Sequence, residues 1–230
     1  MIRSVFTLDI NVFFQELDEL FRTNQIDKVE PYILSQMVVA NQQHNTDASL
    51  AIINELIGFY RSQNRFEESI RVSKQALDLC KHEYILGSIS HATTLLNAAT
   101  AYRFAGKPQE AMELYEQAEA IYRDQLNPFD ERNASLYNNI SAACSDLGQN
   151  DRAVDYLLRA TAIMDAIPQR IIESAVSHAN LAALYAKMQN WHGAKSHIAT
   201  ACNTLRDRPE AAAQYAQFKA LQDMFESHPD

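Results

Sequence analysis

Apolar residues recur along most of this chain at the three-to-four-residue spacing of an amphipathic helix. Between Thr93 and Tyr122 two such stripes follow one another. The first consists of Leu95, Ala98, Ala99 and Tyr102, and the second of Ala111, Tyr115, Ala118 and Tyr122. Gly106 and Pro108 separate the stripes, where glycine suits a left-handed helix end and proline suits the first turn of the next helix. The segment therefore predicts two antiparallel helices of about 15 residues each.

The helix-pair pattern recurs with steps of 42, 42 and 41 residues. A first small position in the second helix holds Ser69, Ala111, Ala153 and Ala194, and a second small position holds Ala76, Ala118, Ala160 and Ala201. A bulky position in the first helix holds Tyr60, Tyr102, Cys144 and Tyr185. All three positions share the same period, which predicts an all-α solenoid of stacked helix pairs. The four repeats are expected at about residues 48–88, 89–131, 132–172 and 173–208.

The two ends depart from the repeat. Residues 1–47 predict a degenerate helix pair whose apolar stripe is Ile10, Phe13, Phe14, Leu17, Leu20 and Phe21. Residues 209–230 predict a capping helix with Tyr215, Phe218, Leu221 and Phe225 on one face. Solenoids need end units that cover their last apolar surface. The alternative is that the C-terminal aromatic face docks a second copy, which would give a homodimer, or docks a further domain.

Composition narrows the class of partner. The 230-residue chain has a net charge of −9 and a pI near 5.2, which argues against nucleic acid and anionic membranes as partners. Its apolar runs are too short to span a bilayer. The N-terminal residues Met1–Asp9 lack the apolar core of a secretory signal. Three cysteines form no motif, and free thiols fit a reducing compartment. A cytoplasmic protein is expected.

One repeat carries a family resemblance. The series Ala99, Tyr102, Gly106, Ala111 and Ala118 resembles the signature of the tetratricopeptide repeat. The common form of that repeat has about 34 residues, and the 42-residue unit here is similar to the kinesin-light-chain type. The segments from Leu95 to Tyr122 and from Leu126 to Ile163 carry the likeness, which extends over about residues 50–205. It implies a right-handed superhelical solenoid that acts as a protein-interaction module.

Asparagine recurs in the first helices, which line the concave groove of a stacked helix-pair solenoid. Five residues before the bulky position stand Asn97, Asn139 and Asn180. Asparagine is only a middling helix former, and its carboxamide can bond an extended peptide main chain through both donor and acceptor. The kinesin-light-chain resemblance implies that these three residues grip the ligand main chain. Alternatively, each one bonds a neighbouring helix and sets the register of the stack.

Other inward positions complete the expected groove. Thr100 belongs to a column of small residues that leaves room on the groove floor, and Asn138 also faces inward in a first helix. Arg61, Arg103 and Lys187 would favour an acidic partner, unless each is an ordinary solvated surface charge. The lysines and arginines of a chaperone-type carboxylate clamp are missing from the matching positions, which disfavours chaperone C-terminal tails as ligands.

Catalytic motifs are missing from the sequence. It contains no glycine-rich phosphate loop, zinc-binding HExxH or CxxC. His192 and His197 are five residues apart and do not share a helix face as paired metal ligands would. We therefore predict a non-enzymatic protein without cofactor or metal, which binds a peptide or a segment of a protein partner in its groove. The alternatives are a structural self-association module and a regulatory receptor for a signalling peptide.

Overall fold

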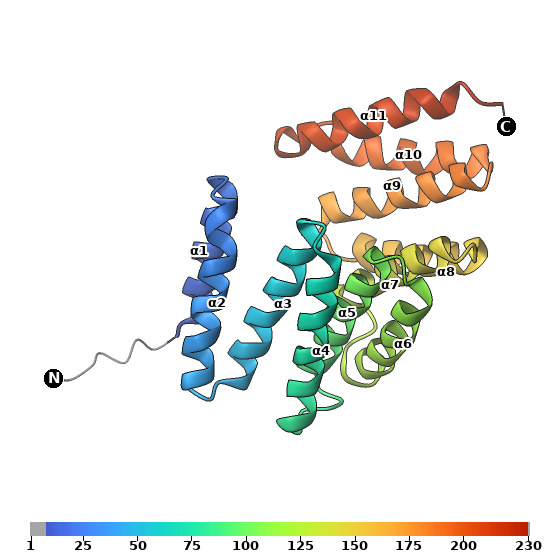
Figure 1. The fold of residues 1–230 in the computed structure, drawn as a ribbon. Coiled ribbons are helices and arrows are strands. Elements are labelled where there is room, and N and C mark those ends of the chain that lie inside the picture. The colour runs from blue at the N-terminus through green and yellow to red at the C-terminus, as the bar shows by residue number, and fades with distance from the viewer. Residues whose placement is uncertain (1–7, 230) are drawn as a thin grey trace. The chain divides into compact units, whose positions relative to one another are not determined.

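The computed structural model describes residues 8–229 and is entirely helical over that range, without strands. The helices are α1 (Ile10–Arg22), α2 (Ile26–Gln42), α3 (Thr46–Ser62), α4 (Phe66–His82), α5 (Ile89–Phe104), α6 (Pro108–Gln125), α7 (Glu131–Asp146), α8 (Asn150–Asp165), α9 (Ile171–Lys187), α10 (Trp191–Leu205) and α11 (Ala212–Glu226). A short 3-10 turn, Pro209–Ala211, precedes α11. Figure 1 shows successive helices running back and forth as antiparallel pairs. The all-α helix-pair solenoid predicted from the repeats is confirmed.

The chain forms two compact units, Met1–Ile121 and Tyr122–Asp230. In the first unit α1 to α5 pack in succession, joined by most of α6. In the second unit α7 to α11 pack in the same way. The expected repeat boundaries fall close to helix starts: α3 begins at Thr46, α5 at Ile89, α7 at Glu131 and α9 at Ile171. The division into two units had no sequence signal, because it falls inside α6.

Each repeat makes the same turn between its two helices. The backbone N–H five residues after the bulky position donates to that position's carbonyl oxygen, at 2.8, 3.0, 2.8 and 2.9 Å. The donors and acceptors are Arg65 to Tyr60, Lys107 to Tyr102, Gln149 to Cys144, and Asn190 to Tyr185. The residue before each donor adopts the left-handed conformation and is Asn64, Gly106, Gly148 or Gln189. This bond closes the helix end and turns the chain back on itself.

The two small positions lie where the helices of a pair cross most closely. Every one of their eight residues, from Ser69 to Ala201, is 0 % exposed. The approach is close enough for side chains to reach the opposite backbone: Ser69 Oγ donates to the Ile57 carbonyl at 2.9 Å, and Ser141 Oγ donates to the Ala153 carbonyl at 2.8 Å. Small residues at a crossing allow this approach, and larger neighbours fill the space beside them.

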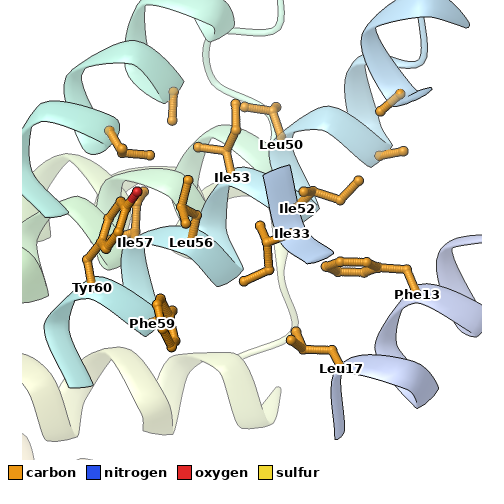
Figure 2. Packing of buried hydrophobic residues seen from close by; sticks show 14 of the residues in the cluster. Phe13, Leu17, Ile33, Leu50, Ile52, Ile53, Leu56, Ile57, Phe59 and Tyr60 are labelled. Atoms are coloured by element: carbon orange, nitrogen blue, oxygen red, sulfur yellow. The ribbon is translucent and has the colours of Figure 1, made fainter. Parts of the chain in front are cut away.

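The core of the first unit includes the irregular N-terminal helices. Figure 2 shows Phe13 and Leu17 of α1 and Ile33 of α2 directed at the apolar face of α3, in one cluster of buried residues. A polar clamp reinforces this packing, because Tyr60 Oη donates to Glu30 Oε1 at 2.7 Å and Arg65 pairs with the same carboxylate. These hydrogen bonds, Arg65 first and then Tyr60, lower the pKa of Glu30. The α1–α2 pair thus covers one face of α3.

The C-terminal helix covers α10 in the second unit. Phe218 and Phe225 are buried in a cluster with α10, and Tyr215 and Leu221 pack against the same cluster. Trp191, at the start of α10, lies 6.2 Å from the Phe225 ring centroid. The aromatic face considered for docking a second copy is therefore occupied by the chain's own α10.

Candidate functional site

A groove runs between α7 and α9, the first helices of the third and fourth repeats. It contains a cavity of about 320 Å³, lined by Asn138, Ser141, Ala142, Ser145, Leu157, Asn180, Ala183, Leu184 and Lys187. A second cavity of about 430 Å³ is lined by Glu131, Arg132, Ser135, Asn138, Met164, Arg170, Glu173, Val176 and Ser177. Asn138 borders both cavities, so they are two parts of one feature, which we call the α7–α9 groove.

Small side chains create the space in this groove. Ala142 of α7 and Ala183 of α9 stand at the position expected to leave room on the groove floor, and both line the first cavity. Leu157 of α8 and Leu184 of α9 are buried beneath it and supply an apolar base. The groove therefore combines an apolar floor with amide and hydroxyl groups on its walls, as is typical of sites that orient a ligand through a few polar contacts.

Asn138 and Asn139 point in different directions. Asn138 is half-buried on the groove, and its Oδ1 is buried without a hydrogen-bond partner. Asn139 does not line either cavity, and its Nδ2 donates to the Ser135 carbonyl one turn back on its own helix at 2.8 Å. Consecutive helical residues point about 100° apart, which separates the two amides. Asn180 is exposed on the facing helix and lines the first cavity.

Charged groups stand at both ends of the groove. At one end Lys187 Nζ donates to the Ser145 carbonyl at 3.0 Å and to Ser145 Oγ at 2.7 Å, which ties α9 to α7. At the other end Arg170 pairs with Glu131 and Glu173. The hydrogen bonds that Arg170 donates, to Glu131 first and then to Glu173, raise the pKa of Arg170. Much of the charge at the Arg170 end is therefore balanced within the protein.

The remaining expected site residues lie in the first unit. Thr100 is nearly buried: its hydroxyl donates to the Leu96 carbonyl at 2.8 Å and lies 3.0 Å from Tyr115 Oη, so it joins α5 to α6. Asn97 is half-buried on α5. Arg61 of α3 and Arg103 of α5 lie near one aromatic ring, that of Phe104. Of the eight residues expected to line the groove, Arg61, Asn97, Thr100 and Arg103 therefore belong to the first unit, and Asn138, Asn139, Asn180 and Lys187 to the second.

Some groove residues were not expected from the sequence. Leu157 belongs to a second helix, and its apolar spacing marks it as core. Arg170 lies in the connector before α9, outside the repeat positions. Within residues 8–229, no group of three or more histidine, cysteine or acidic side chains could hold a metal ion. None of the helices described is both long and hydrophobic enough for a membrane span.

Known proteins share this architecture. Two family profiles described as tetratricopeptide repeat match residues 48–124 and 134–163. The crystal structure of BtubC (BKLC) from P. vanneervenii is similar over 96% of this chain and 83% of its own, with 19% identity and a TM-score of 0.73. A putative kinesin light chain from Podosopora anserina, with nearly identical TPR-like repeats, aligns over 99% of this chain and 100% of its own, with 19% identity and a TM-score of 0.62.

A third similar structure is a Signal Transduction ATPase with Numerous Domains from Pyrococcus horikoshii, which has a tetratricopeptide repeat sensor. It covers 94% of this chain and 32% of its own, with 12% identity and a TM-score of 0.73. At such identities these likenesses show the fold alone. No curated protein matches the sequence.

The repeat profiles and the helix-pair geometry agree. Tetratricopeptide repeats are generally non-catalytic and indicate a scaffold for protein–protein interaction. The matched profiles cover the helix pairs α3–α4 and α5–α6 and the pair α7–α8, and the same turn recurs in α9–α10. This chain therefore contains tetratricopeptide repeats at residues 48–124 and 134–163.

Proposed function

We propose that this scaffold binds an extended peptide segment of a protein partner in the α7–α9 groove, with Asn138 and Asn180 bonding the peptide main chain. The observation that carries the proposal is the Asn138 carboxamide, whose oxygen is buried and lacks a hydrogen-bond partner. An unsatisfied buried acceptor costs free energy that a ligand donor would recover. Rotation of the amide about its last side-chain bond turns either oxygen or nitrogen toward the groove.

Asn180 supplies the second half of the arrangement. It projects from α9 into the same cavity that Asn138 borders from α7. Two amides on facing walls match the alternating N–H and C=O groups of an extended main chain, because each amide carries both donors and an acceptor. Side chains of the peptide would then rest on the apolar base formed by Leu157 and Leu184. Recognition of the main chain with shallow side-chain pockets suits a flexible partner segment.

Lys187 and Asn139 have secondary places in this proposal. Lys187 holds Ser145 across the end of the groove, so it limits how far a peptide extends and adds a positive charge there. The Asn139 carboxamide N–H already donates to the Ser135 carbonyl of its own helix, so Asn139 is not assigned a peptide contact. We also place the protein in the cytoplasm, because its three cysteines are buried and form no disulfide, which fits a reducing compartment.

The experiment compares two adjacent asparagines. Peptides would first be selected from a random displayed library on the wild-type chain, and their affinities measured by isothermal titration calorimetry. Asn138→Ala should weaken binding about tenfold, since it removes hydrogen bonds to the main chain. Asn139→Ala is the matched control and should change affinity less than about twofold. Equal losses in both variants, or no loss in Asn138→Ala with its fold intact by circular dichroism, would refute the proposed binding mode.

A further inference from the structure

A pocket of about 290 Å³ lies at the C-terminal end of α8, lined by residues of α8, α9, α10 and the connector between α8 and α9. Its apolar wall consists of Met164, Ile167, Pro168 and Ile171. Its polar side includes Asp165, the last residue of α8, and we call it the Asp165 pocket. The pocket lies wholly within the second unit, and the two asparagines of the proposed peptide site do not line it.

The hydroxyl groups of this pocket use their hydrogen atoms within the protein. Ser174 Oγ donates to Asp165 Oδ1 at 2.5 Å. Thr200 Oγ1 donates to the Ser196 carbonyl at 3.1 Å, and Thr204 Oγ1 donates to the Thr200 carbonyl at 2.9 Å. Each hydroxyl oxygen retains lone pairs, so with these bonds in place the hydroxyl groups can only accept hydrogen bonds from a ligand.

The Asp165 carboxylate has no lysine or arginine partner anywhere in residues 8–229. Its side chain is 46 % exposed, so a ligand can reach it, and His178 Nε2 lies 3.4 Å from Oδ2. A neutral imidazole donates to a carboxylate without cancelling its charge. The basic residues nearby are engaged elsewhere, because Arg170 pairs with two glutamates and Arg208 pairs with Glu210.

The end of α8 adds to this negative potential. The carbonyl groups at a helix C-terminus carry a partial negative charge that favours a cation. The last turns of α3 and α9 contain Arg61 and Lys187, whereas the last turn of α8 contains no basic residue and ends in Asp165. The pocket therefore combines an apolar wall, hydrogen-bond acceptors and a carboxylate whose charge no lysine or arginine balances.

We propose that the Asp165 pocket binds the ammonium group of a lysine side chain from a protein partner. An ammonium has three N–H donors and no acceptor, so it complements a site that offers acceptors. Asp165 supplies the opposite charge, and the hydroxyl oxygens of Thr200 and Thr204 offer further acceptors. The aliphatic stem of the lysine packs on the apolar wall. A guanidinium fits less well, because its planar fork needs both carboxylate oxygens and Ser174 already occupies one.

The test is a methyl NMR titration of the full chain at pH 8, well above the ordinary pKa of histidine. The reporters are the δ1 methyl groups of Ile167 and Ile171, which line the pocket, and Ile70 in the first unit is the remote control. The probes are N-acetyl-lysine N-methylamide, its norleucine counterpart, which keeps the stem without the ammonium, and its arginine counterpart. We expect a saturable shift with the lysine probe and at least about tenfold weaker binding of the norleucine probe.

Variants then test the carboxylate and one hydroxyl separately, with circular dichroism as the control for folding. Asp165→Asn should weaken binding of the lysine probe at least about tenfold, because it removes the charge and keeps the size of the side chain. Asp155→Asn, at an exposed position of the same helix, makes the same change of charge and should leave the affinity within about twofold. Thr200→Val removes an acceptor without altering Asp165 and should weaken binding about threefold.

The outcomes separate this pocket from the α7–α9 groove. Equal affinities for the lysine and norleucine probes would overturn recognition of the ammonium, and tighter binding of the arginine probe would overturn the assignment to lysine. Equal losses in Asp165→Asn and Asp155→Asn, or no saturable shift in the wild-type chain, would overturn the site itself. Since the pocket contains neither Asn138 nor Asn180, its failure would leave the groove proposal standing, and loss of the Asn138 effect would leave this pocket standing.

Discussion

The two glycines inside helices provide a paired test of the packing. Gly58 lies in α3 and Gly193 in the first turn of α10. A methyl group at Gly58 would meet only Arg61 Nη2, at 3.9 Å, which is an ordinary van der Waals contact. A methyl group at Gly193 would meet Tyr185 Cγ at 3.0 Å, Tyr185 Cδ2 at 3.1 Å and the Asn190 Oδ1 atom at 3.2 Å.

These contacts give the two substitutions opposite signs. Alanine in a helix interior is favoured over glycine by about 1 kcal/mol, and nothing at Gly58 opposes that gain. At Gly193 the same gain is offset by overpacking, which typically costs about 1–3 kcal/mol. The Tyr185 ring cannot move away freely, because it stacks on His197 at 5.6 Å. The Asn190 oxygen is also held, since it accepts the Gly193 N–H at 2.9 Å as the N-cap of α10.

We therefore expect Gly58→Ala to raise the free energy of unfolding by about 1 kcal/mol and Gly193→Ala to lower it by up to about 2 kcal/mol. Urea unfolding followed by circular dichroism measures both, and an unchanged slope with denaturant shows that the comparison is valid. If Gly58→Ala destabilises the protein, the open space described beside Gly58 is wrong. If Gly193→Ala stabilises it as much as Gly58→Ala, the tight contact with Tyr185 is wrong.

Two further predictions concern the second unit. Gln189 adopts a left-handed conformation with φ of 60° where two other repeats have glycine. Gln189→Gly should therefore stabilise the protein by about 1 kcal/mol in urea unfolding. Gln63→Gly is the control and should not stabilise it, because Gln63 has a negative φ of −90°. Burial, and then the charge of His178 at 2.9 Å, lower the pKa of His197, so the unfolded state binds the proton more readily. The free energy of unfolding should fall as the pH drops below about 6.5, by at most about 1.4 kcal/mol per pH unit. His197→Gln should flatten this pH dependence, whereas His192→Gln should not. An unchanged pH dependence in His197→Gln would contradict the assignment to His197.

The repeat positions were readable from the sequence because packing dictates them. Only small residues fit where paired helices cross, so Ser69, Ala111, Ala153 and their equivalents follow the 42-residue period and are completely buried. The turn residues Gly106 and Gly148 were readable for a similar reason, since the left-handed conformation restricts the choice of residue. Backbone geometry and close packing thus leave strong marks on a single sequence.

The residues that line the groove were harder to predict from the sequence, because lining depends on small differences in the direction of neighbouring side chains. Asn138 and Asn139 are identical in chemistry and adjacent, yet only Asn138 lines the groove, while Asn139 bonds its own helix. The 42-residue period alone favoured Asn139, because asparagine stands at the equivalent position of the second and fourth repeats, as Asn97 and Asn180. Thr100 was expected on the groove floor, but Tyr115 from the second helix reaches its hydroxyl. A bond within one helix decides the first case and a contact between two helices decides the second, and neither follows from the spacing of residues along a helix.

The most direct test of the central claim is a crystal structure of the chain with a peptide selected from a random library. We predict an extended peptide in the α7–α9 groove, with its main chain hydrogen-bonded to the side-chain amides of Asn138 and Asn180. A peptide bound elsewhere on the molecule, or one lying in the groove without a main-chain contact to Asn138, would contradict the account.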